Sequence, residues 1–202
     1  DLTGGKGIGG DFGKGALAGG ALGLLLGNRR VRKMGGKVAI YGGLAAVGAL
    51  AYKAYGDWKQ QQGGAGAASA ASQTFDALPP AEIESHSQAI LKALIAAAKA
   101  DGHVDDRERQ VIEGEFSRLD AAPEVRQWLQ AELQKPLDPA EVARAATTPE
   151  MASEMYLASL LAVDEQNFME RAYLDELARQ LKLDEGLKAR LEQQMKEAGD
   201  AV

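Results

Sequence analysis

The uneven distribution of glycine divides this chain into two parts of different composition. Of the 24 glycines, 20 lie at or before Gly66. Residues 1–75 carry nine Lys/Arg and three Asp, a net charge of +6, and the remainder carries 14 Lys/Arg and 26 Asp/Glu, a net charge of −12. A basic, Gly/Ala-rich leader before an acidic body predicts one ordinary domain with a membrane-attached appendage.

The composition divides the chain into four segments. Residues 1–34 form a Gly-rich basic leader, 35–58 an expected transmembrane helix, 59–80 a flexible linker, and 81–202 a helical domain. The linker contains the run QQQGGAGAASAASQ, in which no face is apolar enough to be buried.

The expected membrane span is Val38–Tyr55, which has 18 residues and a single charge at Lys53. A spanning helix needs about 20 apolar residues, with a range of about 17–25. Tyr and Trp near the two ends fit the interfacial positions that such residues prefer. Two alternatives stay open: a hairpin that also uses Gly15–Gly27, and a leader that lies on the membrane surface.

Basic residues cluster immediately before this span, at Arg29, Arg30, Arg32, Lys33 and Lys37. The positive-inside rule keeps such a cluster cytoplasmic, so the acidic domain is expected on the far side of the membrane. The same cluster could instead dock on anionic lipid, at about 1 kcal/mol per basic residue. No aromatic residue interrupts the run and the body is acidic, so no nucleic acid partner is expected.

The leader also contains a glycine stripe. Gly15, Gly19, Gly23 and Gly27 recur every four residues, so on a helix they form one face without side chains. Such a face lets two helices approach closely in lipid. We therefore expect a homo-oligomer formed through this stripe.

From residue 81 onward, apolar residues recur at intervals of three and four, and Pro or Asp marks almost every break. No segment alternates with a period of two, so the predicted fold class is all-α. In the sixth helix, Phe168 is expected to face inward with Tyr173 and Leu174. The seven predicted helices cover about 83–100, 106–119, 123–134, a short segment after Asp138-Pro139, 149–163, 168–181 and 185–198.

A weak internal repeat relates Ala100–Glu108 to Ala162–Glu170. Each stretch ends one helix, crosses a polar turn and restarts with an Asx-x-x-Glu capping box. In the first copy, Asp101, Asp105, Asp106 and Glu108 could also wrap a divalent cation, because hard cations prefer oxygen ligands. Ordinary capping explains the same residues and is the favoured interpretation.

Few residues could support catalysis. There is no cysteine, and no serine lies in a recognisable nucleophile motif. His86 is expected to be a half-buried core histidine, because it lies near the apolar stripe of its helix. The chain is therefore not expected to be an enzyme, and the alternative is a site that forms only on oligomerisation.

Two stretches, GLAAVGALAYKAY at Gly43–Tyr55 and LKALIAAAKADGHVDDRE at Leu91–Glu108, resemble the YebE-like bacterial inner-membrane family. The soluble part of that family is similar to the tellurite-resistance TerB fold. The resemblance implies a TerB-like helical bundle behind a membrane segment, stress-response associations and no established enzymatic activity. It also implies metal binding through acidic turns, with Asp101, Asp105 and Glu108 matching the first motif; Val163 departs from the second.

Together these features predict a non-enzymatic, membrane-tethered helical interaction module without a cofactor. We expect it to cross the bacterial inner membrane once, with the helical domain in the periplasm, and to bind a protein of the cell envelope. The alternative is a divalent-cation sensor or buffer built on the acidic turn 101–108.

Overall fold

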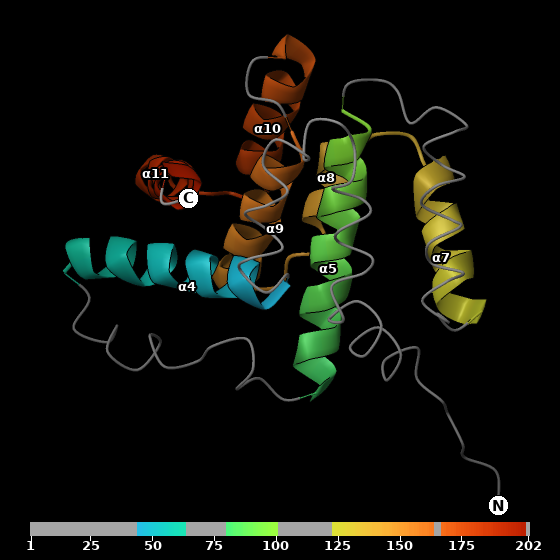
Figure 1. Cartoon of the computed structure of the whole chain (residues 1–202), viewed down its shortest axis with the longest axis horizontal. Helices are drawn as coiled ribbons and strands as arrows, with labels where there is room; N and C mark the ends of the chain where they lie inside the picture. The colour runs from blue at the N-terminus through green and yellow to red at the C-terminus, as the bar shows by residue number, and fades with distance from the viewer. Residues whose placement is uncertain (1–43, 64–79, 101–122, 164–166, 201–202) are drawn as a thin grey trace, which may run out of the picture.

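The computed structural model describes residues 44–63, 80–100, 123–163 and 167–200. Within these ranges the protein is entirely α-helical, which confirms the predicted fold class for this part of the chain (Figure 1). The helices are α4 (Leu44–Gln61), α5 (Pro80–Ala98), α7 (Pro123–Gln134), α8 (Pro139–Ala143), α9 (Pro149–Ala162), α10 (Phe168–Gln180) and α11 (Glu185–Asp200).

Six of the seven helices predicted after residue 80 are present close to their expected positions. The remaining predicted helix, 106–119, lies outside the described residues. Proline occupies the first position of α7, α8 and α9, where its missing N–H costs nothing. Side chains cap four helix starts: Asp138 accepts from Ala140 N at 2.9 Å, Thr148 from Met151 N at 3.1 Å, Asn167 from Met169 N at 2.9 Å, and Asp184 from Gly186 N at 2.8 Å.

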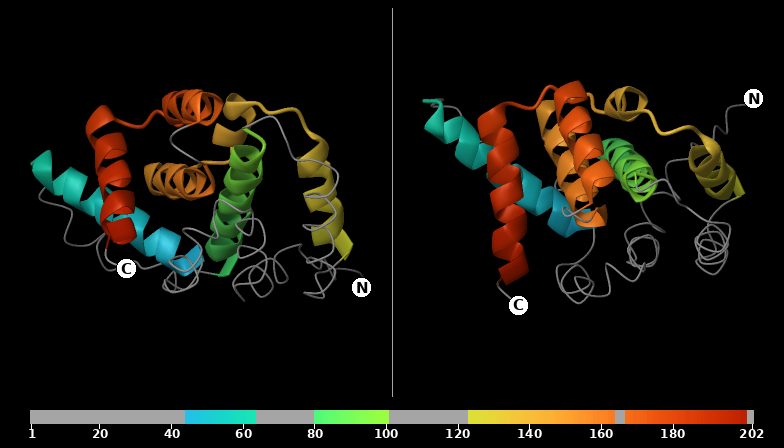
Figure 2. Two further views of the ribbon diagram at one scale, coloured as in Figure 1. Left: turned by 45° about the horizontal axis from the view of Figure 1, so that its top comes forward. Right: turned by 90° about the horizontal axis from the view of Figure 1, so that it is seen from above.

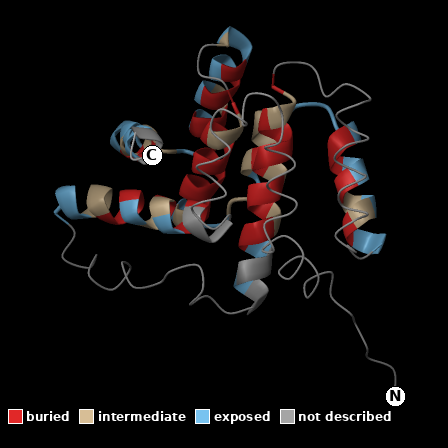
Figure 3. Cartoon of the chain, in the orientation of Figure 1, coloured by how far each residue is buried: buried red, intermediate tan, exposed pale blue. Residues whose placement is uncertain are grey.

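Helix α9 is the centre of the domain. Every residue from Met151 to Leu160 is buried, and α4, α5, α10 and α11 all pack against this helix (Figure 2). A helix buried on all sides needs an apolar or small residue at nearly every position. The other helices bury one stripe each and expose the opposite face, as Figure 3 shows for α7.

Helix α4 packs into this core although it begins inside the segment predicted to span the membrane and ends in the predicted linker. Val47, Ala51, Ala54 and Tyr55 are buried, and the helix contacts α9 and α11. None of the helices in the described ranges has the length and apolar character required to cross a bilayer. The first residues of the predicted span, 38–43, lie outside the described residues, so the span stays a prediction.

The prediction that Phe168 faces inward was wrong. Phe168 is 80% exposed, and Glu170 is buried instead. The buried stripe of α10 contains Tyr173, Leu174 and Leu177. At 100° per residue, position 168 lies about 200° from position 170, so it points away from the stripe to which Glu170 belongs.

Candidate functional site

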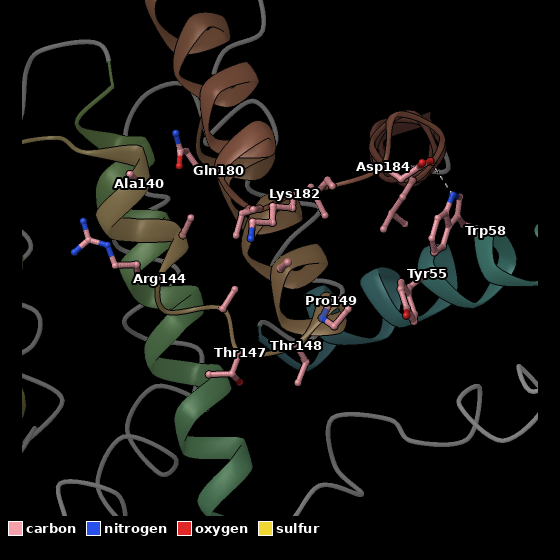
Figure 4. A pocket seen from close by; sticks show the side chains of 16 residues that line it. Tyr55, Trp58, Ala140, Arg144, Thr147, Thr148, Pro149, Gln180, Lys182 and Asp184 are labelled. Atoms are coloured by element: carbon pink, nitrogen blue, oxygen red, sulfur yellow. Dashed lines mark hydrogen bonds between the residues drawn. The ribbon is translucent and has the colours of Figure 1, made fainter.

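A pocket of about 600 Å³ opens where α4, α8, the start of α9 and the end of α10 meet (Figure 4). Its wall combines the aromatic rings of Tyr55 and Trp58 with small side chains of α8 such as Ala143. The polar part of the lining consists of Arg144, Thr147, Thr148, Gln180, Lys182 and Asp184. Helices far apart in the sequence thus build one concave site, whose volume is typical of pockets for small ligands.

Hydrogen bonds fix the aromatic wall in place. The rings of Tyr55 and Trp58 lie 5.7 Å apart with a tilt of 34°. Trp58 Nε1 donates to Asp184 Oδ1 at 3.1 Å, and Gly186 N donates to the same oxygen at 2.8 Å (Figure 4). A Cβ on Gly186 would lie 3.1 Å from Asp184 Oδ1 and 3.4 Å from Trp58 Nε1, so glycine permits this close approach.

Lys182 is held in an unusual backbone conformation at the pocket. Its φ is 55°, the only positive φ among the non-glycine residues that the structure describes. Lys182 N donates to Arg179 O and Leu183 N to Ala178 O, both at 3.1 Å, which is the Schellman ending of a helix. Glycine usually occupies this position, because a left-handed conformation costs an L-residue about 1–2 kcal/mol. In Figure 4 the ammonium group points toward the space between α8 and α10.

The charges at the pocket are unbalanced. Arg144, directly after α8, and Lys182 both line the pocket and are exposed, and neither forms an ion pair with any described residue. The single carboxylate of the lining, Asp184, already accepts two hydrogen bonds. Burial raises the pKa of Tyr55, and the charge of Glu150 raises it further. The Tyr55 hydroxyl is therefore neutral at physiological pH.

A second polar cluster is sealed inside the domain. His86 Nδ1 of α5 and Glu154 Oε2 of α9 form a hydrogen bond of 2.5 Å, and the two residues are 6% and 0% exposed. Burial raises the pKa of Tyr52 to about 12, helped by the charges of Glu154, Glu150 and Glu82. His86 is a core histidine, as predicted, but more deeply buried than expected.

Sequence analysis missed Glu154. The available clue was that this glutamate is the only charged residue between Met151 and Ala162, a run that is otherwise apolar or small. A lone charge inside such a run has no solvent-facing side to occupy when the whole helix is buried, so it requires an internal partner. The pocket was missed as well, because it depends on how α4 meets α8 and α10.

The residues predicted to bind a metal, Asp101, Asp105, Asp106 and Glu108, lie outside the described residues, so the cation site stays a prediction. In the part of the chain that the structure does describe, no three His, Cys, Asp or Glu residues cluster as metal ligands would. The glycine stripe of Gly15, Gly19, Gly23 and Gly27 also lies outside it. Of the two predicted capping boxes, the Asn167 cap is confirmed by its bond to Met169 N.

Comparisons with known proteins place the chain in a family. Residues 11–195 match the family described as "Protein of unknown function (DUF533)". A relative from Yersinia enterocolitica, described as "Uncharacterized protein in ampR 5'region", is 32% identical over 122 residues, which are 60% of this chain and 88% of the relative. No solved structure matches significantly. Since the family match covers almost the whole sequence, this chain belongs to the DUF533 family.

Proposed function

We propose that this protein is a non-enzymatic helical binding module, held at a membrane by residues before Leu44, that takes a small ligand into the pocket between α4, α8 and α10. The observation that carries the proposal is the pocket itself. Its volume of about 600 Å³ lies within the range of ligand sites, and its aromatic wall offers a large apolar contact area.

The lining favours binding over chemistry. Most of its side chains are alanine, leucine or aromatic. Its one carboxylate, on Asp184, accepts hydrogen bonds from Trp58 and Gly186, which makes it a structural group. A general base would have to be free to reach a proton on the substrate.

Membrane attachment is assigned to the leader because α4 uses its apolar face inside the domain. Val47, Ala51 and Ala54 cannot face lipid while they pack in the core. The basic run Arg29–Lys33 and the glycine stripe provide electrostatic and helix-packing means of attachment and self-association. The resemblance to YebE-like proteins and to the TerB fold supports a bacterial inner membrane location and a role in stress response. The basic cluster before Val38, which the positive-inside rule keeps cytoplasmic, is the ground for a periplasmic domain with an envelope protein partner.

The pocket can be tested with N-phenyl-1-naphthylamine, an uncharged aromatic dye that fluoresces in apolar sites. The full chain in detergent is expected to bind it, and Ala143→Phe, which places a ring in the pocket, is expected to abolish binding. Ala131→Phe on the exposed side of α7 is the control. Binding that survives Ala143→Phe, with both variants folded by circular dichroism, would refute a ligand site at this pocket.

Attachment can be tested separately by fractionation of bacteria that express the chain with an epitope tag after Val202. The protein is expected in the membrane pellet, with the tag accessible to protease only from the periplasmic side. Carbonate extraction separates a spanning leader, which stays in the pellet, from a surface-docked leader, which is released. Recovery in the soluble fraction would reject the membrane part of the proposal.

A further inference from the structure

We infer that the pocket selects a small organic anion, with its acidic group held by Lys182 and its apolar body against Tyr55 and Trp58. This inference rests on the proposed binding function and adds the chemical class of the ligand. Carboxylate, sulfonate and phosphate groups share the required chemistry, because each offers charged oxygens to ammonium and guanidinium donors.

The first support is the contrast between paired and unpaired cations. Residues 76–202 carry a net charge of −12, so carboxylates are abundant near most basic side chains. Arg179, three residues before Lys182, pairs with Glu176 at 2.7 Å. Lys182 lines the pocket and forms no such pair with the described residues. Among the described residues, the other cations paired with a carboxylate are Lys92 with Glu141, Lys135 with Glu132, Lys188 with Asp175 and Arg190 with Asp57, whereas Lys53, Arg126 and Lys196, which do not line the pocket, form no ion pair.

The second support is the backbone of Lys182. Its φ of 55° suits glycine, yet this position carries a long cationic side chain that points into the space between α8 and α10 (Figure 4). Strained backbone of this kind is enriched at binding and active sites, although here the Schellman turn also accounts for the left-handed φ. The left-handed turn aims the lysine at the pocket rather than along the exposed face of α10.

The negative groups near the pocket leave room for an added anion. Asp184 accepts from both Trp58 and Gly186, so part of its charge is already compensated. Glu150, whose charge reaches Tyr55, does not line the pocket. Tyr55 stays protonated, so it presents a neutral ring and hydroxyl to the ligand.

Two dyes with nearly the same aromatic body test the inference: 8-anilinonaphthalene-1-sulfonate carries an anion, and N-phenyl-1-naphthylamine does not. The full-length protein is expected to bind the sulfonate more tightly. Lys182→Gly keeps the backbone favourable and removes one charge-assisted contact, so it is expected to weaken sulfonate binding about tenfold and to leave the neutral dye unchanged.

Lys196→Gln, on the exposed face of α11 and outside the pocket, is the charge-matched control and is expected to change neither affinity. Octanoate is expected to displace the sulfonate dye, and octanol is not. Equal affinities for the two dyes, unaffected by Lys182→Gly, would overturn the inference and leave the binding pocket in place. Failure of both dyes to bind would overturn the proposed function itself.

Discussion

The buried His86–Glu154 pair and the pocket both lie beside α9, and they differ in whether their charged side chains have partners. Along α9, Glu154 is fully buried and meets His86 at 2.5 Å inside the protein. At the beginning of α9, the pocket presents Lys182 and Arg144 without an ion-pair partner among the described residues. The first site pairs one carboxylate oxygen of Glu154 with His86 and so contributes to stability, while the other oxygen, Oε1, is buried without a hydrogen-bond partner among the described residues. The second leaves its charges open, which is what a site for an external anion requires.

The largest expected effect comes from breaking the sealed pair. Glu154→Ala leaves the His86 ring buried beside a cavity, and breaking a buried pair on one side typically costs about 3–5 kcal/mol. Chemical denaturation monitored by circular dichroism measures the loss. Glu150→Ala, one turn earlier and partly exposed, is expected to cost less than about 1 kcal/mol. Similar losses in the two variants would mean that the pair is not the main stabilising contact of this region.

A substitution at the pocket is expected to raise the stability of the protein rather than lower it. Lys182→Gly is expected to stabilise the protein by about 1 kcal/mol, because glycine adopts a positive φ without steric strain. Arg179→Gly, inside α10, is expected to destabilise it by about 1 kcal/mol, since glycine is a poor helix former. Urea midpoints of the two variants provide the comparison. A loss of stability in Lys182→Gly would show that the side chain holds the native turn, which contradicts a role in ligand binding.

A third kind of charge contact, half-buried and paired, joins α4 to α11. Arg190 Nη2 lies 2.8 Å from Asp57 Oδ2, and both side chains are about a third exposed. A double-mutant cycle with Asp57→Ala and Arg190→Ala is expected to give a coupling energy of about 0.2–1 kcal/mol. A coupling energy as large as the loss expected for the buried His86–Glu154 pair would show that burial does not determine how much a charge pair contributes to stability.

The fold of the helical part could be predicted from sequence because residues close in the sequence determine where its helices begin. Pro123, Pro139 and Pro149 start helices, and Thr148 and Asn167 cap them, so the relevant interactions span only a few residues. Phe168 was misassigned because its position in the first turn allows either face to be chosen from periodicity alone. The structure resolves the choice through the stripe that begins at Glu170.

The sites could not be predicted in the same way. Helices rich in Ala and Gly have the same sequence pattern whether they face lipid or a protein core. The sequence around α4 therefore gave no indication that Tyr55 and Trp58 form a pocket wall. Lys182 showed no sequence signature, because lysine at the end of a helix is common and its left-handed φ follows from the Schellman turn. Long-range packing determines both features.

Alkaline titration of Tyr52, a half-buried phenol of α4, probes the surroundings of the sealed pair. The pKa of Tyr52 is raised from 10.0 to about 12 in the folded protein, first by burial and then by the charges of Glu154, Glu150 and Glu82. Below pH 10 the phenol is protonated in both states, so its contribution to stability is complete. Between pH 10 and 12 the unfolded chain releases this proton more readily, so the free energy of unfolding falls.

Tyr52→Phe is expected to make that fall shallower, as measured by urea unfolding at pH values from about 8 to 11. Burial also raises the pKa of Tyr173, so part of the fall remains in the variant. Glu154→Gln, which keeps the shape but removes one of the charges acting on Tyr52, is expected to shift phenol titration toward lower pH. If the free energy of unfolding of Tyr52→Phe falls with pH as steeply as that of the unchanged protein, the charge of Glu154 does not act on this phenol. The sealed site would then consist of His86 and Glu154 alone.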